Sequence, residues 1–201
     1  STILAEAEQL RRDLQTRSTM WIRGLPIRTA TELVHSETSK PPLTLKSLES
    51  PAAAIGSALH AVMERVDFEK RSDQLEILCR SVALEFGIPE AAKELVALAA
   101  KAFDAPIFKR IMEAKAVHRE VPFSWRKGDT MYEGVIDVVL EEKDGLTLID
   151  YKTDRVSDEN LKERATFYEP QIRLYAEALA SITKKPIKEA LIFFVRLPKS
   201  V

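Results

Sequence analysis

The sequence predicts a mixed α/β domain, and the order of its periodic segments is the main reason. Helix-like segments, with apolar residues three and four positions apart, fill the first half, and strand-like segments begin near residue 117. A long helical segment and a β-rich run close the sequence. With 201 residues, 45% of them hydrophobic, the chain can bury a substantial core. We expect a central mixed β-sheet flanked by helices, with a helical N-terminal part.

The N-terminal part is expected to be separate from the domain that follows it. Residues 2–17 are typical of a charged helix, and residues 20–42 of an extended or irregular lead-in. We expect residues 1–45 to form a linker or accessory segment and residues 46–201 to form the domain.

Four helices are expected in the first half of the domain. The clearest begins at Pro51, because Ile55, Leu59, Val62 and Val66 follow it on one apolar stripe. The expected ranges are 51–66, 72–86, 89–103 and a short helix at 106–114.

The second half is expected to form a β-meander, a helix and a last strand. Residues 143–145, Lys-Asp-Gly, are typical of a hairpin turn and would make the strands on either side antiparallel neighbours. Pro170 is a candidate break point in the helix. The expected ranges are strands at 117–125, 132–142 and 146–151, a helix at 158–182 and a β-rich run at 187–197.

The composition limits the classes of function. The formal net charge of −1 provides no overall attraction to nucleic acid, so any DNA affinity must come from a local surface. Cys79 is the single cysteine, which excludes an internal disulfide and any four-cysteine iron–sulfur cluster within the chain. A Walker-type phosphate loop is absent, so the chain by itself is not a P-loop ATPase.

Nothing in the sequence predicts a membrane protein. The longest uncharged stretch, residues 51–63, is too short to span a bilayer, and no signal peptide is visible. We expect a cytoplasmic location. The sequence opens with Ser1, so either an initiator methionine was removed or the chain is a piece of a longer protein.

Two aspartates and a lysine stand on the adjacent apolar strands of the hairpin. Charged groups in such strands are costly to bury unless something compensates them. Alternation would place Asp137 on one face with Val135 and Val139, and Asp150 on one face with Lys152, so the two acids can converge. Two carboxylates suit a hard ion such as Mg²⁺, which can polarise a phosphate and activate a bound water. A nearby lysine can orient that water or stabilise the developing charge.

These motifs resemble those of the PD-(D/E)xK nucleases. More narrowly, they resemble the RecB-type nuclease domain at the C-terminal end of the bacterial recombination helicase–nucleases RecB and AddA. The resemblance covers most of the chain, from residue 55 to residue 195. It is carried by Gly134-Val-Ile-Asp137, Ile149-Asp-Tyr-Lys-Thr153, Gly56-Ser-Ala-Leu-His60, Gln171-Ile-Arg-Leu-Tyr175 and Arg119-Glu-Val-Pro-Phe123.

The resemblance implies a restriction-endonuclease-like core and a role for each motif residue. The implied metal ligands are His60, Asp137, Asp150 and the backbone carbonyl of Tyr151, with Glu120 as a candidate additional ligand. Lys152 would be the catalytic lysine. Gln171 and Tyr175 lie at i and i+4 on one helix face, where they would position the scissile phosphate or the lysine.

The resemblance also implies a cofactor, a substrate and partners. The cofactor would be Mg²⁺, with Mn²⁺ as a substitute, and the substrate DNA, cut by an exonuclease rather than an endonuclease. The partner would be a helicase region on the same parent polypeptide or a partner helicase–nuclease subunit, in recombination and double-strand break repair. Because the cysteines of the cluster-containing relatives are absent, the chain is nearer the cluster-free RecB and AddA branch.

Each motif residue also has a structural interpretation. A histidine on an apolar helix, as His60 is, commonly belongs to the core, and a tyrosine such as Tyr175 commonly packs with a wet hydroxyl. Asp150 and Lys152 could form an ion pair of little energetic value. Several charged residues after the second hairpin strand are expected to be solvated surface, and some of the basic ones could contact phosphates. They are Asp154, Arg155, Lys162, Arg164 and Arg173.

Two other functions remain open. The first is a catalytically silent nuclease-like module that binds DNA or serves as a scaffold, but loss of Asp150 or Lys152 would be its mark and both are present. The second is a stand-alone nuclease linked to a CRISPR system or a mobile element. The missing cluster cysteines weaken that alternative without excluding it.

Overall fold

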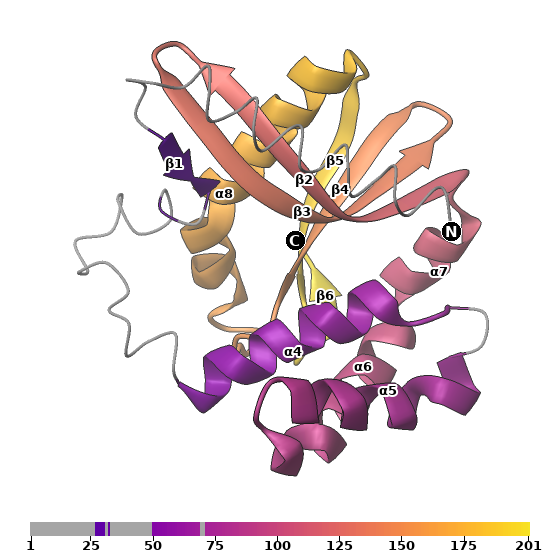
Figure 1. Cartoon of the computed structure of the whole chain (residues 1–201). Coiled ribbons are helices and arrows are strands. Elements are labelled where there is room, and N and C mark those ends of the chain that lie inside the picture. Colours follow the sequence, from indigo (N-terminus) through magenta and orange to yellow (C-terminus); the bar gives the residue numbers. More distant parts are fainter. Residues whose placement is uncertain (1–26, 31, 33–49, 69–70) are drawn as a thin grey trace, which may run out of the picture.

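The structure is a computed structural model that describes residues 27–30, 32, 50–68 and 71–201 (Figure 1). The predicted helix at 2–17 and most of the N-terminal segment lie outside these residues. The four helices expected after residue 50 are present, the third preceded by a 3₁₀ turn at Pro89–Ala91, and a long helix follows the meander. The helices are α4 (Pro51–Arg65), α5 (Arg71–Glu85), α6 (Ala92–Phe103), α7 (Pro106–Glu113) and α8 (Leu161–Thr183).

The strands form one mixed sheet of six in the described part of the chain. Its order is β1-β3-β4-β5-β6, and β2 pairs with the other edge of β3. The β3–β4 and β2–β3 pairs are antiparallel, whereas β4–β5 and β1–β3 are parallel. The strands are β1 (Ile27–Thr29), β2 (Ala116–Lys127), β3 (Thr130–Glu142), β4 (Gly145–Lys152), β5 (Ile187–Phe194) and β6 (Lys199–Ser200).

Helices cover both faces of this sheet, and each face has its own core. One core joins α4–α7 to the sheet through side chains such as Leu59, Phe108 and Ile149. The other joins α8 to the sheet through side chains such as Leu148 and Ile172. Burying each large apolar side chain contributes about 1.5–3 kcal/mol, so the two cores fix the sheet between its helices. Among the described helices, none is long and apolar enough to cross a membrane.

β3 changes its inward face at Asp137, which corrects the predicted alternation. Before this residue Ile136 packs in the core of α8, whereas after it Val138 packs in the core of α4–α7. Val135 is therefore 42% exposed and does not share a face with buried Val139. On β2, Glu120 lies between the Arg119–Val138 and Val121–Ile136 pairs and has a φ of +49°, in the left-handed region that non-glycine residues rarely adopt. In both strands, the side chains after this position therefore point to the opposite face from the one that simple alternation predicts.

α8 runs through Pro170 without a break, contrary to the candidate break point. Proline removes one backbone hydrogen bond and its ring crowds the preceding turn. Residues after Pro170, among them Ile172, Leu174 and Leu179, are buried against the sheet and hold the helix in place. Packing therefore outweighs the local preference.

Candidate active site

The predicted site residues meet where β3 and β4 separate. The ladder between these strands ends at the Val138–Ile149 pair, while β4 stays paired with β5 as far as Lys152. The next residues along are Asp137 and Asp150. Asp137 Oδ2 accepts a hydrogen bond from the backbone N–H of Tyr151 at 2.5 Å, so a side chain replaces the lost ladder bond. For Tyr151 the contact is through its N–H, and its carbonyl stays a predicted ligand.

His60 reaches this fork from α4. Its Nδ1 lies 3.2 Å from Asp137 Oδ1 and 4.0 Å from Glu120 Oε1. One ligand atom from each of His60, Glu120 and Asp137 lies within 4.8 Å of the others. Glu120, whose backbone is strained, lies at this point, and strained backbone residues are common at functional sites.

Gly56 explains how α4 comes close enough. A Cβ atom added at Gly56 would lie 3.1 Å from Thr153 Oγ1, tighter than ordinary van der Waals contact. His60 follows four residues later, on the same face of the helix. The Gly-x-x-x-His spacing therefore combines a close helix–strand contact with an imidazole one turn further on.

Lys152 forms the other half of the site. Its Nζ lies 2.5 Å from Asp150 Oδ2 and donates a hydrogen bond to Gln171 Oε1 at 3.1 Å. Gln171 Nε2 in turn donates to the Tyr175 hydroxyl at 2.8 Å. Asp150, Gln171 and Tyr175 are buried and Lys152 is nearly so, which makes these contacts more than a surface ion pair. Gln171 thus contacts the lysine directly, and Tyr175 acts on it through Gln171.

Burial and crowding shift the pKa values of these groups. Burial raises the pKa of Asp150 to about 6 although Lys152 opposes the shift, and burial with Asp137 nearby raises the pKa of Glu120 to about 7. Burial lowers the pKa of His60, but the Asp137 carboxylate outweighs it and raises the pKa to about 9. Burial would raise the pKa of Asp137, yet His60 holds it below its ordinary value.

This donor set fits a divalent cation. Three carboxylates and an imidazole lie at this fork, and burial raises the pKa of two of the carboxyls, Glu120 and Asp150. A hard divalent ion would favour their ionised forms and would replace the proton on the imidazole. His60, Glu120 and Asp137 offer the closest group of ligand atoms, and Asp150 stands beside them on Lys152.

Near Lys152, the sequence did not single out Tyr168, and the prediction for Asp154 and Arg164 was wrong. Asp154 and Arg164, expected to be solvated, are partly buried, and both hydrogen-bond to the hydroxyl of Tyr168. The correction has a physical reason: the segment after β4 folds back onto α8, which shields these charges from water. The spacing of Tyr168 from Gln171 and Tyr175, three and then four residues further on, could have indicated a shared helix face.

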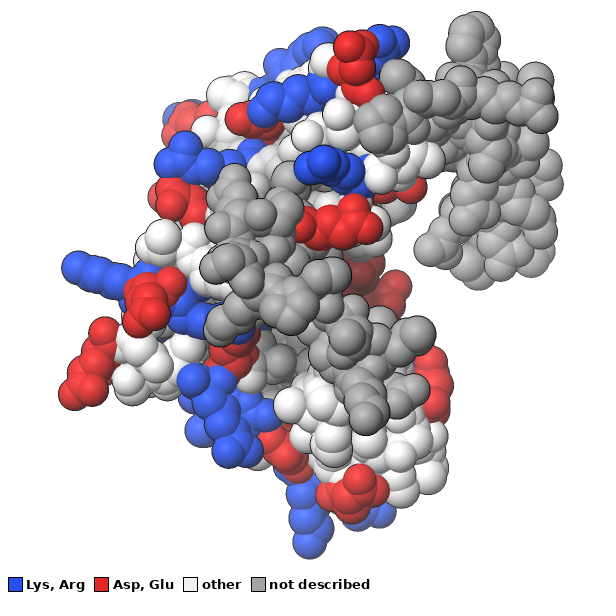
Figure 2. Space-filling model, turned by 90° about the vertical axis from the view of Figure 1, so that its left-hand side faces the viewer, with Lys and Arg blue, Asp and Glu red and all other residues white. Residues whose placement is uncertain are grey.

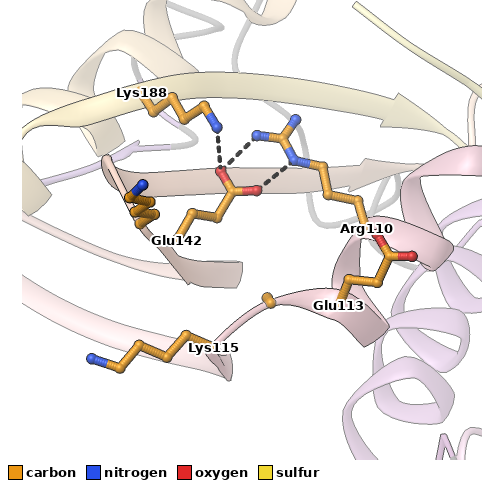
Figure 3. A pocket seen from close by; sticks show the side chains of 7 residues that line it. Arg110, Glu113, Lys115, Glu142 and Lys188 are labelled. Carbon is orange, nitrogen blue, oxygen red and sulfur yellow. Dashed lines mark hydrogen bonds and ion pairs between the residues drawn. The ribbon is translucent and has the colours of Figure 1, made fainter.

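A separate open pocket of about 690 Å³ lies at the hairpin end of the sheet (Figure 3). Its central group is Glu142, whose carboxylate accepts hydrogen bonds from Arg110 and lies 3.4 Å from the ammonium of Lys188. Glu142 stands five residues beyond Asp137 on β3, about 16 Å away along the strand. Arg110 and Lys188 compensate Glu142, and this pocket is separate from the site.

The comparison with protein families decides the classification. A model of the PD-(D/E)XK nuclease superfamily matches residues 34–201. The chain belongs to this nuclease superfamily. The mixed sheet with helices on both faces is consistent with the fold of this superfamily, and its nucleases use divalent metal ions.

Relatives of this superfamily member include components of helicase–nucleases. An ATP-dependent helicase/nuclease subunit from Bacillus mycoides is 36% identical over 168 residues, which cover 69% of this chain and 13% of that protein. The corresponding subunit from Carboxydothermus hydrogenoformans is 31% identical over 166 residues, covering 74% of this chain and 14% of that protein. The chain therefore matches about one seventh of the length of these relatives.

Proposed function

We propose that the domain is a metal-dependent DNA nuclease that hydrolyses phosphodiester bonds. The convergence of His60, Glu120 and Asp137 beside the Asp150–Lys152 pair, in a member of a nuclease superfamily, carries this proposal. Between exonuclease and endonuclease activity, we propose an exonuclease, which removes nucleotides from DNA ends. Mg²⁺ is the proposed cofactor, and Mn²⁺ its substitute.

Each site residue has a proposed role. His60, Asp137, Asp150 and the Tyr151 carbonyl would hold the metal, with Glu120 as an additional ligand. When bound, the ion supplies Lewis-acid polarisation of the phosphate and lowers the pKa of a coordinated water. Lys152, held by Asp150 and Gln171, orients the attacking water or stabilises charge on the phosphate. Tyr175 holds the amide of Gln171 in the orientation that accepts from the lysine.

The names of the relatives suggest the setting of this activity. Residues 46–201 would be the nuclease part of a recombination and repair helicase–nuclease, with the helicase on the same polypeptide or on a partner protein. Residues 1–45 would be a linker or accessory segment. A cytoplasmic location accompanies this proposal, because bacterial DNA is in the cytoplasm.

The test is degradation of linear DNA by the purified chain with Mg²⁺ or Mn²⁺. Asp150→Ala should lower the rate by more than about a hundredfold, because a ligand and the partner of Lys152 are lost together. Asp144→Ala, at an exposed aspartate of the hairpin, is the matched control and should cleave normally. Circular dichroism should show both variants folded.

Two outcomes would count against the proposal. Equal rates for Asp150→Ala and the unaltered chain would reject the site. An unaltered chain that binds DNA but cleaves none with either metal would instead indicate the silent DNA-binding module.

A further inference from the structure

Tyr168 lies against the ammonium of Lys152. The centre of its ring is 4.5 Å from Lys152 Nζ, within the range of a cation–π interaction. Gln171, three residues further along α8, contacts the same ammonium. Residues three and four apart share a helix face, so Tyr168, Gln171 and Tyr175 form one row directed at the end of β4.

The ring of Tyr168 is itself held in place. Its hydroxyl donates a hydrogen bond to Asp154 Oδ2 at 2.9 Å and accepts one from an Arg164 terminal nitrogen at 3.1 Å. Arg164 Nε donates to Asp154 Oδ1 at 2.7 Å, which closes the network. Asp154 follows Lys152 by two residues, so the network ties the segment after β4 to α8. The ring of Phe194, on β5, lies 6.4 Å from that of Tyr168.

An aromatic face suits this position better than another acceptor. The lysine ammonium has three N–H donors on a flexible four-carbon chain. Asp150 and Gln171 engage the ammonium on two sides. A ring face attracts the charge without accepting a conventional hydrogen bond, which leaves a donor for water or a phosphate oxygen.

We infer that Tyr168 is a positioning residue that holds Lys152 for catalysis through its ring. The inference rests on the proposed nuclease function. It assigns the hydroxyl the task of fixing the ring and assigns the ring the contact with the lysine.

The kinetic test compares Tyr168→Leu, which removes the ring, with Tyr168→Phe, which keeps it. Tyr168→Leu should lower kcat for DNA cleavage about tenfold, because one of three contacts of the ammonium is lost. KM for DNA should stay within about twofold, since the ring is assigned no contact with substrate. Tyr168→Phe should restore most of the lost rate. Ile182→Ala, at an exposed apolar residue near the other end of α8, is the control and should leave kcat unchanged.

A double-mutant cycle separates positioning from general stability. In a Lys152→Ala background, Tyr168→Leu should cause no further loss of the residual rate, because the ring has no ammonium to hold. A further loss of about tenfold in that background would overturn the inference. Thermal unfolding of every variant provides the check on folding.

NMR spectroscopy, which does not depend on enzymatic activity, tests the contact between Tyr168 and Lys152. The ring current of Tyr168 should shift the NMR signals of the Lys152 side-chain methylenes, which Lys152→Arg identifies by their loss. The shift should persist in Tyr168→Phe and disappear in Tyr168→Leu. Unshifted signals in the unaltered chain would overturn the inference. If that chain cleaved no DNA, the proposed function would fail, and the lysine signals would still decide whether the contact exists.

Discussion

Two buried aspartates at the strand fork each have a positively charged partner. Asp137 is compensated by His60 and accepts the N–H of Tyr151, whereas Asp150 is compensated by Lys152. Because removing one partner leaves an unpaired buried charge, the four residues depend on one another. Three of them, His60, Asp137 and Asp150, are also proposed metal ligands, so the fold itself holds these ligand atoms in place.

His60→Ala should weaken metal binding at least tenfold, because substitutions around a metal site commonly reduce metal affinity by about that factor or more. The imidazole is the proposed nitrogen ligand, 3.2 Å from Asp137 Oδ1, and an alanine side chain has no ligand atom. Titration calorimetry with Mn²⁺ alone would measure the affinity. His118→Ala is the matched control, because His118 is exposed and pairs with Glu141 away from the site. Superimposable isotherms for His60→Ala and the unaltered chain would exclude His60 as a ligand.

At the scale of elements, charged networks join parts of the fold that are distant in sequence. Arg110 of α7 binds Glu142 of β3, as Figure 3 shows. It also binds Glu189 of β5 and donates to Thr147 of β4. One guanidinium therefore connects a helix to three neighbouring strands. On the other face, the Asp154–Arg164–Tyr168 network connects the end of β4 to α8. Together with the two cores, these networks hold α4 and α8 around the fork.

Glu142→Gln should lower the free energy of unfolding at neutral pH by about 1–3 kcal/mol. Hydrogen bonds from Arg110 hold the pKa of Glu142 at about 2. A carboxylate with a lowered folded-state pKa stabilises above its unfolded pKa, about 4.3, and loses that contribution as the pH falls toward the folded value. The difference between variant and unaltered chain should therefore shrink below about pH 4.

Urea unfolding at several pH values would measure this difference. Glu113→Gln is the matched control, because Glu113 lines the same pocket but is exposed and contacts Lys109 only at 3.9 Å. It should change stability by less than about 0.5 kcal/mol. A Glu142→Gln difference that did not vary with pH would contradict the assigned network.

At the scale of the whole molecule, the surface charge is mixed in sign. The formal net charge is −1, and on the face in Figure 2 acidic and basic side chains are interspersed. Many described lysines and arginines are paired, for example Arg65 with Glu85 and Lys185 with Glu141. Attraction to DNA must then come from the site and the basic residues near it.

The isolated chain should bind DNA weakly, and its affinity should fall at least about tenfold between about 50 and about 200 mM salt. Contacts to phosphates release counterions, and in the described part of the chain many basic groups already have an acidic partner that competes with phosphate. Fluorescence anisotropy with a labelled duplex in EDTA, which prevents cleavage, would measure the affinity. Tight binding that persists at high salt would require a contact surface that the fold does not indicate.

Much of the secondary structure and the set of candidate site residues could be predicted from the sequence. Apolar periodicity predicted α4–α8 and the β3–β4 hairpin. Strand alternation drew attention to Asp137, Asp150 and Lys152, and the motifs shared with a nuclease family added His60 and Gln171. Both kinds of signal are local, because a helix face or a strand face repeats every few residues. Local periodicity does not report where a strand changes its inward face, as β3 does at Asp137.

Which charges are buried, and which candidate ligand atoms meet, depends on contacts between distant segments of the fold. Glu120 joins His60 and Asp137 because two paired strands turn over together, and no spacing along the chain records that geometry. Asp154 and Arg164 looked like surface residues because their burial depends on the path of the segment after β4. Continuity of α8 through Pro170 likewise came from packing against the sheet. Contacts between distant segments are set by packing of the whole fold, which the local pattern does not contain.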